Sequence, residues 1–450
     1  MKPLKSTVLN FKRLSLIVVI FTLASCAPDK PIVLSSSDFQ SSVDKVTSIM
    51  VHDIFSPPVA SRIYAYPNIA AYEILAQSDP KMRSLTQSIK HLKPIPQVKD
   101  STLNLELAAL IAHMELSKSL VFSEERMEQY RDSLYGLWSQ QNKSEFTQAR
   151  DYGLSVAQHI KLWMNTDQYN QTRTMPKFTV ITEDPSRWQP TPPAYMDGIE
   201  PHWNKIRPFI LDSASQFKPI PPPAFSLEKN SAFYRELMDV YDTSKRIEAQ
   251  GDGSDEIRMA QFWDCNPYVS VTRGHLMFAT KKITPGAHWI GITKIACNQT
   301  GLDFKQTISA YTHTSMAIFD AFISCWDEKY RSNLIRPETL INQYVDENWK
   351  PVLQTPPFPE YTSGHSVVSG AASTVLTKIF GPEFAFDDDT EVPYGLPIRS
   401  FQSFELAAKE AALSRMYGGI HYRAAIEIGL DQGISVGQQV LQSLSLSHTH

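Results

Sequence analysis

Residues 329–337 have the sequence KYRSNLIRP, residues 363–365 are SGH, and residues 414–421 are SRMYGGIH. Each stretch is common by itself. A lysine and an arginine seven positions apart are usually solvated, and Ser-Gly-His is often a turn. Their joint occurrence in this order decides how we interpret the chain.

Brought together, these residues would form a pocket for a compact oxyanion. Its cations would be Lys329, Arg336 and Arg415, because arginine offers paired planar donors and lysine adds a point charge. The glycine after Ser363 lets an anion approach backbone N–H groups, and a helix starting there would add the positive end of its dipole. Of the two histidines, one can attack or ligate the anion while the other moves protons near pH 7.

The joint pattern resembles the signature of the superfamily of type 2 phosphatidic acid phosphatases and vanadium-dependent haloperoxidases. That signature is Lys-x6-Arg-Pro, then (Pro)-Ser-Gly-His, then Ser-Arg-x5-His-x3-Asp. All three parts occur over residues 329–421 with the right internal spacing, apart from two substitutions, and weaker likeness extends back to about residue 186. The resemblance implies a helical-bundle fold and an oxyanion site in its C-terminal part.

The resemblance also assigns roles to single residues. His421 matches the axial ligand of vanadate, or the nucleophile that forms a phosphohistidine in a phosphatase. His365 matches the acid–base partner at the apical oxygen, and Lys329 the residue that polarises bound peroxide. The positions that hold the equatorial oxygens are matched by Lys329, Arg336, Ser363, Gly364 and Arg415. The implied cofactor is vanadate, whereas a phosphatase would need none.

The chain departs from the signature at two positions. Thr362 replaces the proline before Ser363, and we expect little effect. Ala425 stands four residues after His421, where the family has an aspartate that orients the histidine through its far nitrogen. Another carboxylate or a backbone carbonyl can take that role; otherwise the site is degenerate.

Two aromatic residues point to the haloperoxidase branch, as does the length of the chain. Trp326 matches a tryptophan of the halide pocket, and Phe358 matches a phenylalanine of the chloroperoxidases, where bromoperoxidases have histidine. A dry aromatic wall would desolvate a halide and favour its oxidation. The alternative is that both are plain core residues. Asp264 is a weaker candidate for bracing an active-site arginine.

The leading prediction is therefore a vanadium-dependent haloperoxidase-like enzyme that oxidises halide with hydrogen peroxide. One alternative is an acid phosphatase that acts on a phosphomonoester through the same pocket. The other is a non-catalytic oxyanion-binding lipoprotein whose site has decayed at Ala425. The sequence does not define an oligomeric state.

Helical spacing of apolar residues predicts an all-α fold of two packed bundles, at residues 41–165 and 228–450. The second would be the catalytic bundle. Residues 166–227 contain eleven prolines between Pro176 and Pro223, a density that excludes helices of ordinary length. Aromatic residues interleaved with these prolines indicate an ordered wrap and not a disordered linker: Trp188, Tyr195, Trp203 and Phe209. No alternating stretch is long enough to predict a sheet.

The N-terminus has the pattern of a lipoprotein signal peptide. Four positive residues precede an uncharged, mostly apolar stretch at residues 14–23, which is too short to span a bilayer. The following residues, 23–26, resemble a bacterial lipobox. We therefore expect removal of residues 1–25, a lipid on Cys26, a tether over residues 26–40, and a location in the cell envelope, at the outer membrane because Ala27 follows. The alternative is an ordinary signal peptide with a chance cysteine.

Composition narrows the remaining possibilities. The 450 residues are 42% hydrophobic and carry a net charge of -4, which excludes wholesale disorder and gives no basic field for nucleic acid. Four cysteines cannot form a disulfide scaffold. In an oxidising compartment Cys265–Cys297 is the candidate bridge, and the alternative is that these two and Cys325 are buried free thiols.

The other histidines lack metal-ligand spacing, and we expect structural roles for them: His52, His113, His275, His288 and His313. The run Asp387-Asp388-Asp389 is typical of a solvated loop.

Overall fold

The structure is a computed structural model that describes residues 30–251, 253–273, 276–279 and 281–444. The expected signal peptide, the expected lipidation site Cys26 and His275 lie outside these residues. Among the described residues, no helix is long and apolar enough to cross a membrane.

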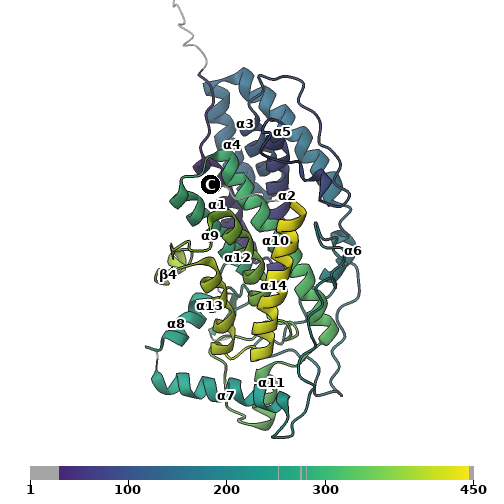
Figure 1. The fold of residues 1–450 in the computed structure, drawn as a ribbon, viewed down its shortest axis with the longest axis vertical. Coiled ribbons are helices and arrows are strands. Elements are labelled where there is room, and N and C mark those ends of the chain that lie inside the picture. The colour runs from purple at the N-terminus through teal and green to yellow at the C-terminus, as the bar shows by residue number, and fades with distance from the viewer. Residues whose placement is uncertain (1–29, 252, 274–275, 280, 445–450) are drawn as a thin grey trace, which may run out of the picture.

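Helices dominate the fold, which confirms the all-α prediction (Figure 1). The N-terminal half contains α1 (Ser36–Asp53), α2 (Pro57–Ala76), η1 (Leu85–Gln87), α3 (Leu105–Lys118), α4 (Glu124–Gln141), α5 (Lys143–Met164), α6 (Tyr169–Thr172) and η2 (Trp203–Lys205). The C-terminal half contains α7 (Ala232–Gln250), α8 (Asp255–Phe262), α9 (Pro285–Thr300), α10 (Phe304–Ser332), α11 (Pro337–Tyr344), α12 (Gly364–Phe380), η3 (Val392–Tyr394), α13 (Phe404–Tyr417) and α14 (Arg423–Leu444).

Two short antiparallel hairpins interrupt the helices. Strand β1 (Ser270–Arg273) pairs with β2 (Leu276–Ala279), and β3 (Phe386–Asp388) pairs with β4 (Arg399–Phe401). With three or four residues each, these strands are too short to produce a readable alternation of apolar and polar residues.

The two expected bundles share one hydrophobic core. A single cluster of buried side chains runs from Ile32 to Leu444, and α2 of the N-terminal half packs against α10 of the C-terminal half. The expected tether also differs, because its last residues are part of the fold. Helix α1 begins at Ser36, and the apolar side chains of Ile32, Leu34 and Phe39 are buried in this core.

The proline-rich segment is an ordered wrap, as predicted. Trp188, Trp203 and Phe209 are fully buried, whereas Tyr195 is exposed. The carboxylate of Asp320 in the middle of α10 accepts the backbone N–H groups of residues 209, 210 and 211, at 2.8, 2.8 and 3.0 Å. The backbone of this segment is therefore fixed to α10 by Asp320. These three N–H groups are satisfied without a helix or a strand.

Helices α12 and α14 lie side by side and touch through their backbones (Figure 1). A Cβ added at Gly433 would lie 2.0 Å from the carbonyl oxygen of Val367, and one added at Gly370 would lie 2.5 Å from that of Leu430. Only glycine permits this approach. It brings the N-terminus of α12 beside that of α14, where the Ser363 N–H donates to the Ala425 carbonyl at 3.0 Å.

Candidate active site

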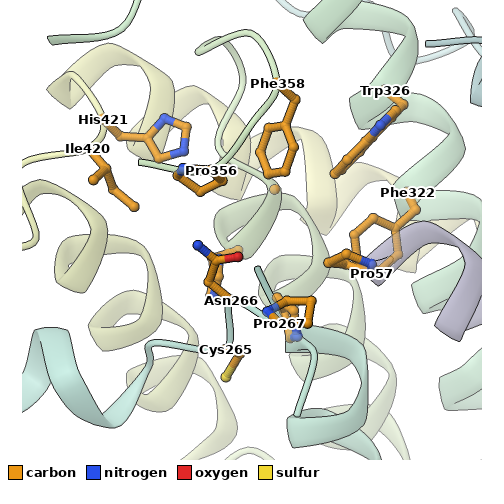
Figure 2. Close-up of a pocket in the computed structure, with 13 residues that line it drawn as sticks. Pro57, Cys265, Asn266, Pro267, Phe322, Trp326, Pro356, Phe358, Ile420 and His421 are labelled. Carbon is orange, nitrogen blue, oxygen red and sulfur yellow. The ribbon is translucent and has the colours of Figure 1, made fainter. Parts of the chain in front are cut away.

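The three sequence motifs converge on one cavity of about 30 Å³ (Figure 2). Helix α10 carries Trp326 and Lys329, Arg336 is the N-cap of α11, Ser363 is the N-cap of α12, Arg415 lies in the last turn of α13, and His421 precedes α14. Of the predicted site residues, the following line the cavity: Trp326, Phe358, Gly364, His365 and His421. The three cations lie behind them in direct contact.

His421 is held with one nitrogen protonated and the other free. Its Nδ1 lies 2.8 Å from Oε1 of Glu360, an oxygen that also accepts the backbone N–H of Tyr422 at 2.9 Å. Its Nε2 lies 3.2 Å from Nη1 of Arg336, a group that can only donate. Both contacts place the proton on Nδ1 and leave the Nε2 lone pair facing the cations.

Glu360 therefore takes the role of the aspartate that is missing at position 425. Its side chain is fully buried, and burial raises the pKa of its carboxyl to about 7. For His421, burial and the nearby Arg336 cation lower the pKa well below its usual value. The imidazole is thus neutral at pH 7, as a ligand or nucleophile must be.

Two arginine N–H groups in the site are buried without a hydrogen-bond partner. Arg336 uses Nε on the Phe358 carbonyl at 2.9 Å and Nη1 on the Ile420 carbonyl at 2.7 Å, but its Nη2 has none. Nε of Arg415 is also unpartnered. Buried guanidinium donors are costly to leave unpaired, so this pair fits an oxyanion that would accept from both.

The N-terminus of α12 supplies a further anion-binding surface. The Ser363 hydroxyl caps the helix by accepting the N–H of Ser366 at 3.4 Å. The N–H groups of the first turn have no partner within the helix. A Cβ added at Gly364 would point into the space between Trp326, at 3.5 Å, and Cε of Lys329, at 3.9 Å. Glycine therefore keeps this space open.

The ammonium group of Lys329 is fully buried. It donates to three backbone carbonyls of the loop before α12, those of Pro359, Glu360 and Thr362. Burial lowers its pKa to about 8, and the nearby Arg336 cation acts in the same direction. The side chain is therefore a cation at neutral pH that can lose its proton in mild alkali.

His365 faces the cavity from the first turn of α12. Its Nε2 accepts a hydrogen bond from Nη1 of Arg415 at 3.0 Å. Burial and this arginine lower the pKa of His365 well below its usual value, while a backbone hydrogen bond with Trp263 opposes the shift. Nε2 of this neutral imidazole can accept a proton from a bound molecule when Nη1 of Arg415 turns its N–H towards that molecule instead.

One side of the cavity is aromatic. The rings of Trp326 and Phe358 lie 5.0 Å apart, and Figure 2 shows them on the same side of the cavity, facing Asn266 and Pro267. The Trp326 indole N–H donates to the Ile199 carbonyl at 3.1 Å. This wall therefore presents apolar surface and no free indole donor.

Two predictions for residues outside the oxyanion site differ from the structure, one about the cysteines and one about the aspartate run. Cys265, Cys297 and Cys325 are free and buried, so the predicted Cys265–Cys297 bridge is wrong. Asp388 is fully buried and pairs with His288, so the aspartate run is not simply a solvated loop.

The predictions for Asp264 and for two of the other histidines agree better with the structure. Asp264 forms an ion pair with Lys282, and its charge opposes the lowering of the Arg415 pKa by burial. His113 and His313 are buried and their pKa values are lowered to about 3 and about 4, in line with structural roles.

Comparisons with known proteins agree with this geometry. The family model described as "VCPO second helical-bundle domain" matches residues 309–448. The crystal structure of "the first bacterial vanadium dependant iodoperoxidase" is similar with a TM-score of 0.89 and 65% sequence identity, over 92% of this chain and 98% of that chain. The chain therefore belongs to the vanadium-dependent haloperoxidase family.

More distant structures share the fold. The holo and apo forms of a bacterial vanadium-dependent chloroperoxidase are similar with TM-scores of 0.66 and 0.67, at 16% and 17% identity. They cover 87% of this chain and 93% and 94% of theirs. No curated protein matches the chain.

Proposed function

We propose that this protein is a vanadium-dependent iodoperoxidase, which oxidises iodide with hydrogen peroxide. The observation that carries the proposal is the orientation of His421, whose unprotonated Nε2 lies 3.2 Å from Nη1 of Arg336. In the same site, Nη2 of Arg336 and Nε of Arg415 are buried without a hydrogen-bond partner. Vanadate fits this donor set because it offers anionic oxygens to the arginines and a metal centre to the imidazole nitrogen.

Bound vanadate supplies a Lewis-acidic centre that activates peroxide towards a halide. The remaining steps belong to the protein. Arg336, Arg415 and the N-terminus of α12 would hold the oxyanion, and Glu360 keeps the Nε2 lone pair of His421 available to it. His365 is neutral and would take the proton that hydrogen peroxide releases on binding.

The aromatic wall supports iodide as the halide. Iodide is large and polarisable, and it loses its hydration shell more easily than chloride does. A wall formed by Trp326 and Phe358, with the indole N–H used on Ile199, offers dispersion contacts and no donor to replace lost water. The 65% identity to a bacterial iodoperoxidase supports the same choice over the chloride that Phe358 alone suggests.

The test is halogenation by the purified protein loaded with vanadate and supplied with peroxide and one halide at a time. We expect triiodide formation that requires vanadate, peroxide and iodide together, and much slower turnover with bromide or chloride. His421→Ala should abolish turnover and vanadate binding together. Silence with all halides, combined with hydrolysis of p-nitrophenyl phosphate by the vanadate-free protein, would move the assignment to the acid phosphatase. Silence in both assays would favour the non-catalytic alternative.

We also propose that Cys26 carries a lipid that anchors the protein in the cell envelope, at the outer membrane. The support is the lipobox-like sequence at residues 23–26 behind a charged and apolar leader. In cells fed labelled palmitate, the full chain should take up label and sediment with membranes. Cys26→Ser should lose both properties; label that persists in this variant would contradict the anchor.

A further inference from the structure

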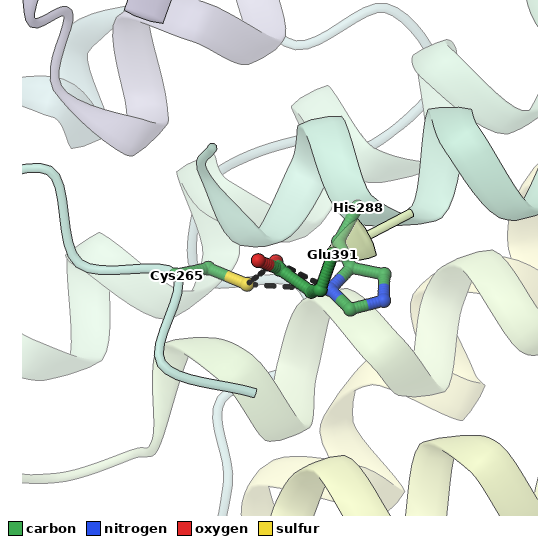
Figure 3. A group of neighbouring side chains, drawn as sticks. All are labelled: Cys265, His288 and Glu391. Atoms are coloured by element: carbon green, nitrogen blue, oxygen red, sulfur yellow. Dashed lines mark hydrogen bonds and ion pairs between the residues drawn. The ribbon is translucent and has the colours of Figure 1, made fainter. Parts of the chain in front are cut away.

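A second cluster of chemically reactive groups lies beside the cavity and has no part in the proposed reaction. It consists of Cys265, which follows α8, His288 in α9, and Glu391, which precedes η3 (Figure 3). All three side chains are buried, with exposed fractions of 1%, 0% and 3%. Three segments far apart in the sequence thus direct one sulfur, one nitrogen and one oxygen atom at the same point.

One contact among these atoms is long for a hydrogen bond. Nδ1 of His288 lies 3.4 Å from Sγ of Cys265 and 3.4 Å from Oε1 of Glu391, and the sulfur lies 3.7 Å from that oxygen. An N–H···O bond is normally about 2.9 Å long. The contacts of the sulfur are of ordinary length for a thiol, but the 3.4 Å between Nδ1 of His288 and Oε1 of Glu391 is well beyond this value.

The same spacing suits ligands around a tetrahedral metal ion. With Zn–S of about 2.3 Å, Zn–N of about 2.05 Å and Zn–O of about 2.1 Å, tetrahedral angles place sulfur and nitrogen about 3.6 Å apart. They place sulfur and oxygen about 3.6 Å apart, and nitrogen and oxygen about 3.4 Å apart. The observed separations of 3.4, 3.7 and 3.4 Å agree within about 0.2 Å.

The orientation of His288 also suits a ligand. Its Nε2 lies 2.9 Å from Oδ2 of the fully buried Asp388. The other oxygen of Asp388 accepts the backbone N–H and the hydroxyl of Thr390, at 3.1 and 2.6 Å. The ring of Trp263 stacks on the imidazole at 4.4 Å. A carboxylate that accepts a hydrogen bond from Nε2 of a histidine leaves the Nδ1 lone pair free to bind a metal. This arrangement is typical of zinc sites.

We propose that Cys265, His288 and Glu391 bind a zinc ion, with Asp388 as the positioning residue for His288. A thiolate with one nitrogen and one oxygen favours zinc over calcium or magnesium, which prefer oxygen ligands alone. Two anionic ligands neutralise the divalent ion, and binding releases two protons to solvent, the thiol proton of Cys265 and the Nδ1 proton of His288.

The zinc ion would fix one wall of the active site. Cys265, Asn266 and Pro267 all line the cavity, and Trp263 forms the backbone hydrogen bond with His365. The metal would tie this segment to α9 and to the loop before η3. The site does not rest on the proposed halide chemistry, because none of its ligands contacts His421, Arg336 or Lys329 among the described hydrogen bonds and ion pairs.

The experiment uses the full-length protein purified without a histidine tag. Elemental analysis should find about one zinc per chain. After removal of the metal with a chelator, titration with CoCl2 should produce the near-ultraviolet absorption band of a cobalt–thiolate bond. Cys265→Ser should abolish this band, whereas Cys297→Ser, which alters another buried free thiol, should keep it. Asp388→Asn should weaken cobalt binding about 10–100-fold.

The proposal is overturned if the isolated protein lacks zinc and the stripped wild type gives no cobalt–thiolate band. It is equally overturned if Cys265→Ser keeps the band. Should Cys265→Ser fail to fold, two other measurements test the proposal. The wild-type titration should still give the band, which itself reports a thiolate ligand, and Glu391→Gln should bind cobalt more weakly. Metal bound at exposed histidines gives no such band, so it cannot imitate the expected result.

Discussion

At the scale of single residues, the site depends on two buried charged groups, the carboxylate of Glu360 and the ammonium group of Lys329. Glu360 fixes the tautomer of His421 from a position three residues before Ser363, and its second oxygen is buried without a partner. Lys329 is held by three carbonyls of the same loop. The pKa values of both groups depend on the charges around them. A substitution or a change of pH at either group therefore tests its role.

We expect Glu360→Gln to weaken vanadate binding about 10–100-fold, because an amide is a poorer acceptor for the His421 N–H and no longer fixes its tautomer. The measurement is activity as a function of added vanadate. Glu73→Gln is the matched control, since Glu73 is also buried and hydrogen-bonded but lies in α2, and should keep vanadate affinity.

Ala425→Asp complements this experiment. Because Glu360 already orients His421, a carboxylate at the fully buried position 425 should bring no gain in activity. It should lower the free energy of unfolding by about 3 kcal/mol or more, as an uncompensated buried charge does. Higher activity in this variant would show that Glu360 does not do the work of the missing aspartate.

Oxyanion binding should weaken above pH 8 because Lys329 loses its proton there. The anion favours the charged lysine, so affinity should fall by up to tenfold per pH unit above its pKa of about 8 in the free protein. Tungstate is a suitable probe, since it stays a dianion across this range, and calorimetry at pH 6.5 to 9.5 gives the affinity. Lys329→Gln should bind more weakly and lack this decline; the same decline in the variant would assign it to another group.

At the scale of elements, the site depends on backbone contact between α12 and α14. Gly433→Ala would place a methyl group 2.0 Å from the Val367 carbonyl. A shift of α12 to relieve this clash would move His365 in its first turn, and a shift of α14 would move His421, which precedes it. We expect loss of vanadate binding and a large fall in thermal stability. Gly136→Ala in α4 is the control, because nothing lies within 4 Å of its added Cβ, and it should stabilise the protein by about 0.5–1 kcal/mol.

The resemblance of the three motifs to the family signature was enough to identify the residues that meet at the cavity, because the joint order and spacing of these residue types is specific. Helical periodicity likewise identified the fold class. Glu360 was missed because its contact with His421 joins residues 61 positions apart and depends on how a loop folds. The buried pair of His288 and Asp388 was missed for the same reason, since a run of aspartates resembles solvated loop until a partner is known.

At the scale of the whole molecule, the two halves and the wrap act as one body. One of the attachments of the wrap to α10 is Asp320, which accepts three buried N–H groups. We expect Asp320→Asn to cost about 1–3 kcal/mol, because the amide nitrogen cannot accept from the N–H that it would face. Chemical denaturation measures this loss. Asp212→Asn, at a side chain that is 86% exposed, should leave stability unchanged.

The glycine contact between α12 and α14 has a consequence for evolution. Main-chain atoms are the same whatever the side chains are, so a spacing set by backbone touching backbone survives extensive substitution elsewhere. Mutations can then accumulate on the outer faces of both helices while the histidines stay in register.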